Sequence, residues 1–218
     1  MLDNVAKSFL SSYPIHLIRN GVDLNLFSPN RELSQGFPAA IPKGTPYLLG
    51  VASVWDSRKG LNDLKALAKI LDKTLPIVVL GLDRKQICAL PPGVVGLSKT
   101  ENVSELAAFY ANATAFVNPT TIDNFPTTNI EALACGCPVI TYRTGGSPEA
   151  IDNTTGIVVE KGDIRGLSAA VMRILAEDKT VLTLNCRNRA ERLFSSTDRY
   201  RDYMSLYGSV IAKGQIEK

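Results

Sequence analysis

Short apolar runs alternate with segments of helical periodicity along most of the chain. The runs are apolar at almost every position rather than at every second one, which is typical of strands buried on both faces. They predict strands at residues 46–52, 76–81, 94–96, 114–118, 138–142 and 156–159. Between and after them, apolar side chains recur three and four positions apart, which predicts helices over residues 61–71, 104–112, 130–134, 163–176 and 197–212.

Strands that alternate with helices indicate one fold class. A helix between two strands of one sheet brings them parallel, and the helices then cover both faces of the sheet. We therefore expect an α/β protein with a doubly wound parallel sheet of the Rossmann type. Such sheets bind ligands outside the carboxyl ends of their strands, so the loops that follow the strands are the places to look for chemistry.

Composition narrows the class of protein further. The 218 residues are 45% hydrophobic and 21% charged, which is the balance of a soluble globular protein. The net charge of +3 is too small to argue for a nucleic-acid partner. No apolar run approaches the roughly 20 residues of a membrane span, and the N-terminus lacks the apolar core of a signal peptide. The four cysteines are few and irregularly spaced, which favours buried, reduced thiols and a cytoplasmic protein.

The loop after the predicted strand at 114–118 carries two carboxylates, Asp123 and Glu131, around a run of small polar residues. Pro126 suits the first turn of a helix, because its missing N–H would have no partner there. The next residues, Thr127 to Asn129, would present free backbone N–H groups at the positive end of the helix dipole, where phosphate binds most often. The alternative is an ordinary helix cap, in which Asp123 or Thr127 satisfies those N–H groups.

Other loops at the same edge of the sheet carry basic residues or glycine. Arg58 and Lys59 follow the first strand, Gly81 ends the second, and Lys99 follows the third. All should converge on one crevice with the helix N-terminus. The only histidine, His16, lies in the apolar run PIHLI and is expected to be a packed strand residue rather than a catalytic base. No cluster of carboxylates or histidines offers a metal site.

Several short motifs in a fixed order carry a family resemblance. They are IRNGVD at 18–23, FSP at 27–29, Lys59-Gly60, DNFPTTNIE at 123–131 continuing into EALACGCPVI, and GGSPE at 145–149. With these motifs the chain resembles, from about residue 14 to its end, the C-terminal half of a GT-B glycosyltransferase of the large retaining class called family 4. The stretch at 123–131 is similar to the family's E-x7-E motif, with aspartate in place of the first glutamate.

The resemblance implies a domain that binds a nucleoside diphosphate sugar without a cofactor or metal. We expect residues 1–196 to form this domain and residues 197–218 to form a helix that crosses back to an acceptor-binding N-terminal domain absent from this chain. The implied reaction is transfer of the sugar to an acceptor with retention, in the synthesis of cell-surface polysaccharides or glycolipids. The family's usual catalytic histidine would lie in the missing domain, so we expect donor binding without efficient transfer. The resemblance leaves open a peripheral contact of the full enzyme with the inner face of the membrane.

The resemblance also implies roles at matching positions. It assigns Lys59 to the diphosphate and Asp123 to the donor-sugar hydroxyls near the reacting carbon, and these two are the expected catalytic residues. Glu131 should accept hydrogen bonds from both ribose hydroxyls. Ser53 stands where the family often has an arginine, which leaves Arg58 as the candidate second cation. The other implied substrate-binding positions are Gly21 in the hinge-side loop, Gly81, Gly96 and Lys99 around the base, and Asn124, Phe125, Pro126, Thr127, Thr128 and Asn129 at the phosphate and sugar.

Two other classes of protein share parts of this pattern. A GT-B sugar-nucleotide epimerase has the same diphosphate site, although the EALACGCPVI context favours the transferase. A non-catalytic nucleotide-binding or flavodoxin-like module also remains open. A dinucleotide dehydrogenase is disfavoured, because no G-x-G-x-x-G follows the first strand.

Overall fold

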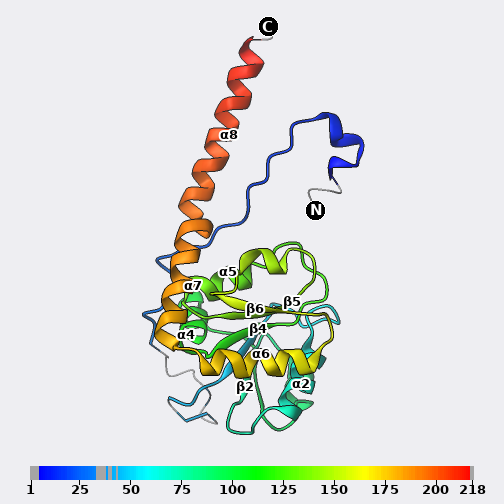
Figure 1. Ribbon diagram of the computed structural model, residues 1–218, viewed down its shortest axis with the longest axis vertical. Helices are drawn as coiled ribbons and strands as arrows, with labels where there is room; N and C mark the ends of the chain where they lie inside the picture. Colours follow the sequence, from blue (N-terminus) through cyan, green and yellow to red (C-terminus); the bar gives the residue numbers. More distant parts are fainter. Residues whose placement is uncertain (1–4, 33–37, 39–40, 43, 217–218) are drawn as a thin grey trace.

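A six-stranded parallel sheet forms the centre of the molecule (Figure 1). The computed structural model describes residues 5–32, 38, 41–42 and 44–216. Neighbouring strands lie in the order β3-β2-β1-β4-β5-β6, and every neighbouring pair is parallel. The predicted doubly wound α/β fold is therefore confirmed. The strands are β1 (Leu48–Val51), β2 (Ile77–Leu80), β3 (Val94–Leu97), β4 (Ala115–Asn118), β5 (Val139–Tyr142) and β6 (Gly156–Val159).

Helices cover both faces of this sheet (Figure 1). On one face lie α2 (Leu61–Ile70) and α6 (Ile164–Ala176). On the other lie α4 (Val103–Asn112), α5 (Thr127–Ala134) and most of α7 (Lys179–Phe194). The short helix α3 (Arg84–Cys88) packs beside β3, while η1 (Phe9–Ser12) and η2 (Ser147–Ala150) are 3-10 turns and α8 (Ser196–Ile216) ends the described chain.

The strands are apolar throughout because each one places side chains in two hydrophobic cores, one on each face of the sheet. Successive side chains of a strand point to opposite faces. In β2, Ile77 and Val79 pack into the core under α2 and α6, whereas Val78 and Leu80 pack into the core under α4 and α5. All four side chains are at most 2% exposed. The uniformly apolar runs in the sequence are thus explained by burial on both sides.

The strand order reverses between β1 and β4. From β1 the chain moves through β2 to β3 at one edge, and then crosses back to β4 on the other side of β1. The loops after β1 and β4 therefore leave the sheet in opposite directions. This is the point at which doubly wound sheets open a ligand crevice at their carboxyl edge.

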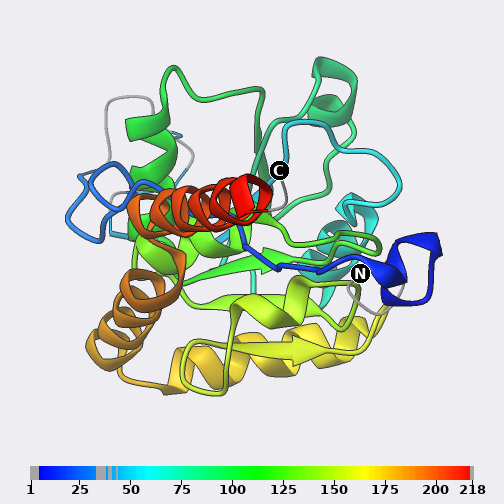
Figure 2. The ribbon, with the colours of Figure 1, turned by 90° about the horizontal axis from the view of Figure 1, so that it is seen from above.

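The chain enters and leaves this domain at one place. The N–H of Val22 donates to the Phe194 carbonyl at 2.8 Å, and the N–H of Ser196 donates to the Val22 carbonyl at 3.0 Å. Beyond this junction, the N-terminal segment and α8 both extend from the same side of the α/β body (Figures 1 and 2).

The structure corrects the sequence-based expectations at four points. Helix α7 was not predicted, because its buried side chains form a narrow row at four-residue spacing within a polar segment. His16 is exposed and lies outside regular structure, so the prediction of a packed strand residue is wrong. Cys88 is exposed, although the other three cysteines are buried as predicted. Helix α3 was also not predicted; it is five residues long and begins with a capping box between Asp83 and Gln86.

Candidate functional site

Two loops meet at the carboxyl edge of the sheet, between β1 and β4. The N–H of Thr121, after β4, donates to the carbonyl of Arg58, after β1, at 2.7 Å. Gly60 opens α2 with a left-handed φ of 77°, and a Cβ there would lie 2.3 Å from the Pro119 carbonyl oxygen. Only glycine fits both the backbone conformation and this close approach. The two loops are thus held against each other at the strand-order reversal.

Lys59 and Asp123 form an ion pair across this point. The Lys59 Nζ lies 2.9 Å from the Asp123 Oδ2, although the residues are 64 positions apart in the chain. Their side chains are 33% and 18% exposed, so the pair is partly shielded from solvent. The two residues that the resemblance assigned to catalysis are therefore in direct contact.

The N-terminus of α5 lies in the same loop and has no side-chain cap. Pro126 occupies the cap position, and no side chain accepts a hydrogen bond from the first turn. The alternative in which Asp123 or Thr127 caps this helix is therefore not the observed arrangement. The N–H of Asn129 donates to the Pro126 carbonyl at 3.2 Å. Within the described chain this leaves the N–H groups of Thr127 and Thr128 at the positive end of the helix dipole.

A glycine pair after β5 supports the loop that holds Asp123. The N–H of Gly146 donates to the Asp123 carbonyl at 3.1 Å. A Cβ at Gly145 would lie 1.9 Å from the Asp123 carbonyl oxygen, and a Cβ at Gly146 would lie 1.8 Å from that of Asn124. The GGSPE motif, which the sequence offered only as a landmark, thus lets two loop backbones touch.

The side chain of Asn129 is committed to the scaffold. It is fully buried, accepts a hydrogen bond from Asn118 Nδ2 at 2.7 Å and donates to the Ser147 carbonyl at 3.2 Å. These bonds join the end of β4, the first turn of α5 and the loop after β5. Asn129 therefore fixes the direction in which the α5 N-terminus points.

Glu131 lies one turn beyond Thr127 on α5 and is partly buried. Residues four apart share a helix face, so its carboxylate lies on the side of Thr127. The Tyr110 hydroxyl donates to Glu131 Oε2 at 3.2 Å. Burial raises the pKa of Glu131 above its usual value, and the hydrogen bond from Tyr110 partly opposes that shift. Among the described residues, no hydrogen bond reaches the other carboxylate oxygen, which lies in a poorly solvated setting.

Arg58 forms its ion pair with Asp56 rather than with Asp123. Its side chain is 60% exposed and pairs with Asp56, with Nη2–Oδ2 at 2.5 Å and Nε–Oδ2 at 3.0 Å. Lys59 is thus the cation that the structure places against the Asp123 loop, and Arg58 points toward its own loop.

The other predicted positions are spread along the same edge of the sheet. Gly81 ends β2 with φ of 92°, and a Cβ there would lie 1.7 Å from the Ala52 carbonyl oxygen. Gly96 in β3 makes room for side chains around α3, and Lys99 is exposed beyond it. Gly21 packs against α8, where its Cβ would lie 2.5 Å from the Ser196 Cα.

Sequence reasoning missed one contact around the site. Both Nε and Nη2 of Arg19 donate to Glu149 Oε2, at 3.2 and 2.7 Å. The Arg19 guanidinium also lies 6.0 Å from the centre of the Phe125 ring, which packs against Phe194 at 5.9 Å. Arg19 and Glu149 both belong to quoted motifs, but they are 130 positions apart and no local pattern pairs them. Phe125 is thus an anchor for the Asp123 loop.

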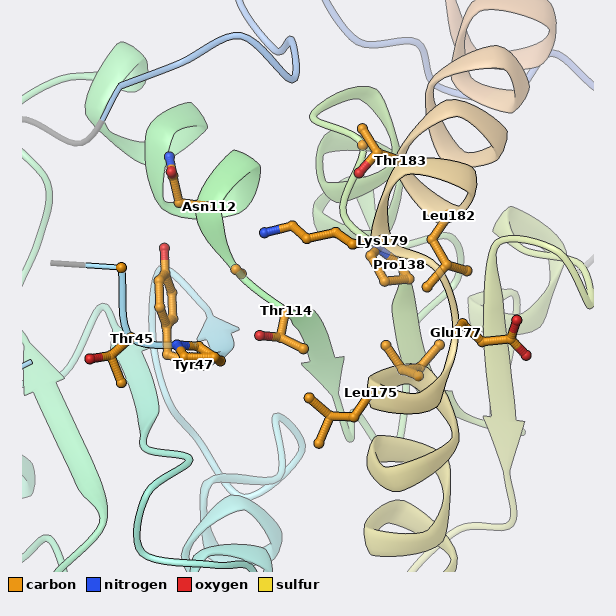
Figure 3. Close-up of a pocket in the computed structure, with 15 residues that line it drawn as sticks. Thr45, Tyr47, Asn112, Thr114, Pro138, Leu175, Glu177, Lys179, Leu182 and Thr183 are labelled. Atoms are coloured by element: carbon orange, nitrogen blue, oxygen red, sulfur yellow. The ribbon is translucent and has the colours of Figure 1, made fainter.

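A separate cavity of about 320 Å³ lies at the opposite, amino-terminal edge of the sheet (Figure 3). Tyr47, Thr114 and Pro138, which precede β1, β4 and β5, line it, and the Lys179 side chain points into it (Figure 3). None of the predicted site residues lies there. Doubly wound sheets bind their ligands at the other edge, so this cavity is separate from the candidate site.

A metal-binding cluster and a membrane-spanning helix are two further features to consider in the described residues. Among those residues, no three His, Cys, Asp or Glu side chains gather where a metal ion could be held. In the same part of the chain, no helix combines the length and apolar character of a membrane span.

The strand order and the reversal between β1 and β4 define a Rossmann-like α/β fold that matches glycosyltransferase structures of the GT-B type. Residues 45–177, more than half of the chain, match the family model described as glycosyl transferases group 1. The chain belongs to this family.

Curated relatives and solved structures agree with this assignment. The capsular polysaccharide biosynthesis glycosyltransferase CapM of Staphylococcus aureus is 31% identical over 53% of this chain and 31% of its own length. The GDP-mannose-dependent alpha-(1-6)-phosphatidylinositol monomannoside mannosyltransferase of Mycolicibacterium smegmatis is 28% identical over 84% of this chain and 53% of its own. Sucrose-phosphate synthase from Thermosynechococcus elongatus superposes with a TM-score of 0.79 at 27% identity, over 97% of this chain and 57% of that one. The chain thus spans about half the length of these relatives or less.

Proposed function

We propose that this chain is the donor-binding half of a retaining glycosyltransferase that uses a nucleoside diphosphate sugar. The observation that carries the proposal is the Lys59–Asp123 pair at the strand-order reversal, beside the uncapped N-terminus of α5. An ammonium group and oriented N–H groups suit a diphosphate, and a carboxylate suits sugar hydroxyls. The functions of the GDP-mannose-dependent mannosyltransferase and of CapM support a nucleoside diphosphate sugar as the donor. They also support a role in making cell-surface polysaccharide or glycolipid.

Each residue then has a part of the donor. Lys59 and the N–H groups of Thr127 and Thr128 hold the diphosphate. Breaking the sugar–phosphate bond leaves negative charge on the nucleoside diphosphate, and these groups stabilise that charge in place. Asp123 accepts hydrogen bonds from hydroxyls of the sugar. Glu131 accepts hydrogen bonds from the ribose diol through the carboxylate oxygen that Tyr110 does not contact.

The base lies toward the β3 edge of the sheet in this proposal. Gly81 and Gly96 let neighbouring groups approach the backbone closely at the ends of β2 and β3, and Lys99 is exposed beyond them. Arg58 reaches the diphosphate only if it leaves Asp56, so we assign the diphosphate to Lys59 first.

Acceptor binding belongs, in this proposal, to a second domain outside the chain. The chain covers 31% of one relative and 53% of the other, and the N-terminal segment and α8 leave the body on one side. Residues 1–196 would form the donor domain, and the helix from 197 onward would pack on its partner. The chain alone would then bind the donor without efficient transfer.

A panel of nucleotides tests this function. Nucleoside diphosphates and their sugar derivatives with uracil, guanine or adenine would be titrated into the protein by calorimetry, with EDTA present. We expect one base to be selected and the sugar nucleotide to bind without divalent metal. A transfer assay with the same donor should show little product. Fast transfer by this chain, or no binding of any sugar nucleotide, would contradict the proposal.

A further inference from the structure

A cavity of about 210 Å³ lies between the entry segment, the start of α5 and the start of α8. Its lining offers two guanidinium groups, one amide and four hydroxyls, with no carboxylate and no apolar side chain except the rings of two tyrosines. Its composition is therefore rich in hydrogen-bond donors and positively charged. The lining residues are Arg19, Asn20, Gly21, Thr127, Ser196, Arg199, Tyr200 and Tyr203.

The carboxylates that hold the two arginines lie outside this lining. Arg19 pairs with Glu149 at 2.7 Å, and Arg199 Nη2 lies 3.1 Å from Asp202 Oδ2. Arg199 has further donor capacity, because a guanidinium carries five N–H groups. Its Nε is buried and has no hydrogen-bond partner among the described residues. Both cations are thus held in position, and Arg199 keeps one buried N–H group without a partner among the described residues.

The walls of the cavity are held by short contacts. The backbone bonds between Val22, Phe194 and Ser196 join the entry segment to the start of α8. Gly21 has no room for a side chain, because a Cβ would approach the Ser196 backbone. Arg19 rests over the Phe125 ring. The donors are therefore preorganised, which reduces the entropy that a ligand must overcome.

We propose that this cavity binds a phosphate group. Guanidinium groups match phosphate oxygens in geometry and charge, and hydroxyls and an amide complete the shell. The volume is below the roughly 300–1,000 Å³ of a pocket for a drug-sized molecule, so it suits a phosphate with a short attached group rather than a nucleotide. Thr127 also belongs to the proposed diphosphate site, and to that extent the inference rests on the proposed function.

Two sources could supply this phosphate. The donor's own diphosphate could extend past Thr127, with Arg199 serving as the second cation that Ser53 does not provide. A phosphorylated acceptor could instead place its phosphate beside the donor. The two sources differ in one respect: a nucleoside diphosphate excludes inorganic phosphate from the cavity in the first case and leaves it in place in the second.

Two variants on the same helix test the cavity. Inorganic phosphate would be titrated into the whole chain by calorimetry at constant ionic strength. Arg199→Ala removes a lining cation, and we expect it to weaken phosphate binding about tenfold or more. Arg201→Ala is the matched control, because Arg201 also pairs with an aspartate on α8 but lies outside the cavity. The phosphate affinity of this variant should equal that of the unmodified chain. Circular dichroism would check that both variants fold.

The outcomes separate this site from the donor site. Repeating the titration with saturating nucleoside diphosphate assigns the source: displaced phosphate indicates the donor, and retained phosphate indicates an acceptor. Lys59→Ala reports on the donor site alone, since Lys59 does not line the cavity, and should leave phosphate affinity unchanged. The inference would be overturned if phosphate binding were undetectable at millimolar concentration. It would also be overturned if Arg199→Ala and Arg201→Ala weakened phosphate binding equally.

Discussion

Lys59 and Asp123 form an ion pair with each other, although the proposed function assigns them to different parts of the donor. A diphosphate that reaches Lys59 must displace the carboxylate and is also repelled by it. A complete sugar nucleotide offers the displaced carboxylate new partners in the sugar hydroxyls. Under the proposed function, the ion pair would therefore favour the intact donor over the nucleoside diphosphate product.

The first prediction concerns Asp123→Ala. Removing the carboxylate frees Lys59, so nucleoside diphosphate should bind about threefold to tenfold tighter, which is on the order of 1 kcal/mol for a partly exposed pair. The sugar nucleotide should lose its advantage over the nucleoside diphosphate. Calorimetry on both ligands measures the two affinities. Equal weakening of both would mean that Asp123 only supports the loop.

Glu131 gives a second prediction, on stability. Burial raises its pKa in the folded chain, so the folded state binds this proton more readily than the unfolded state. Stability therefore falls as pH rises through that pKa, and the ionised carboxylate is a cost at neutral pH. Glu131→Gln should raise the melting temperature at pH 7, and the gain should shrink toward pH 4. A lower melting temperature for the variant at pH 7 would contradict this.

The same variant tests the ribose assignment. If Glu131 accepts hydrogen bonds from the ribose diol, the unmodified chain should prefer a ribonucleoside diphosphate to its 2′-deoxy form, by roughly tenfold. Glu131→Gln should reduce that preference, because it loses the charged acceptor. An unchanged preference would place the ribose elsewhere.

Individual residues of the site were easier to predict than their pairings. Lys59, Asp123 and Glu131 stand in motifs that can be matched by position. Nothing local shows that Lys59 meets Asp123, or that Arg19 meets Glu149 and Phe125, since these partners come from segments brought together by the sheet. Arg58 illustrates the same limit, because its sequence position does not show that it pairs with its neighbour Asp56.

At the scale of elements, the spacing of apolar residues predicted the strands and helices that bury a broad face. All six strands and helices α2, α4 and α6 follow it, as does α5 once its first turn is included. Helix α8 was also predicted, although Tyr207, Val210 and Ile211 on it are exposed. Helix α7 was missed because Leu182, Cys186, Ala190 and Phe194 form a single narrow row, and most of the remaining side chains are polar. A four-residue repeat of small and large apolar side chains was the available signal.

The loop after β5 gives a third prediction. Gly146→Ala forces a methyl group toward the Asn124 carbonyl, so the loop that holds Asp123 must move. Overpacking of this kind costs about 1–3 kcal/mol, and donor affinity should fall with it. Gly208→Ala in α8 meets nothing within 4 Å and should be neutral or stabilising. Thermal unfolding and calorimetry on both variants compare them, and equal behaviour would contradict this account of the loop.

At the scale of the whole molecule, α8 is the part that the α/β body does not use. The side chains of Met204, Tyr207, Val210 and Ile211 are all more than half exposed. The helix begins at the junction with Val22 and then leaves the body (Figure 1). In the proposed function, this apolar surface packs on the second domain.

Truncation gives the fourth prediction. Ending the chain after Tyr203 removes the exposed part of α8 and keeps the cavity residues. Because that part contacts little else, the melting temperature should change by less than about 2 °C, and nucleoside diphosphate affinity should be unchanged. Differential scanning calorimetry measures the first quantity. A large loss of stability would show that the end of α8 supports the body.

Lys59 is the central cation of the proposed nucleotide site. One calorimetric comparison tests this assignment most directly. The preferred nucleoside diphosphate would be titrated, with EDTA, into the unmodified chain, Lys59→Ala and Lys69→Ala, the last being an exposed lysine at the end of α2. A charge-assisted phosphate contact contributes roughly 1.5–3 kcal/mol, so Lys59→Ala should weaken binding about ten- to a hundredfold while Lys69→Ala binds as the unmodified chain does. Unchanged affinity in Lys59→Ala would contradict the central claim.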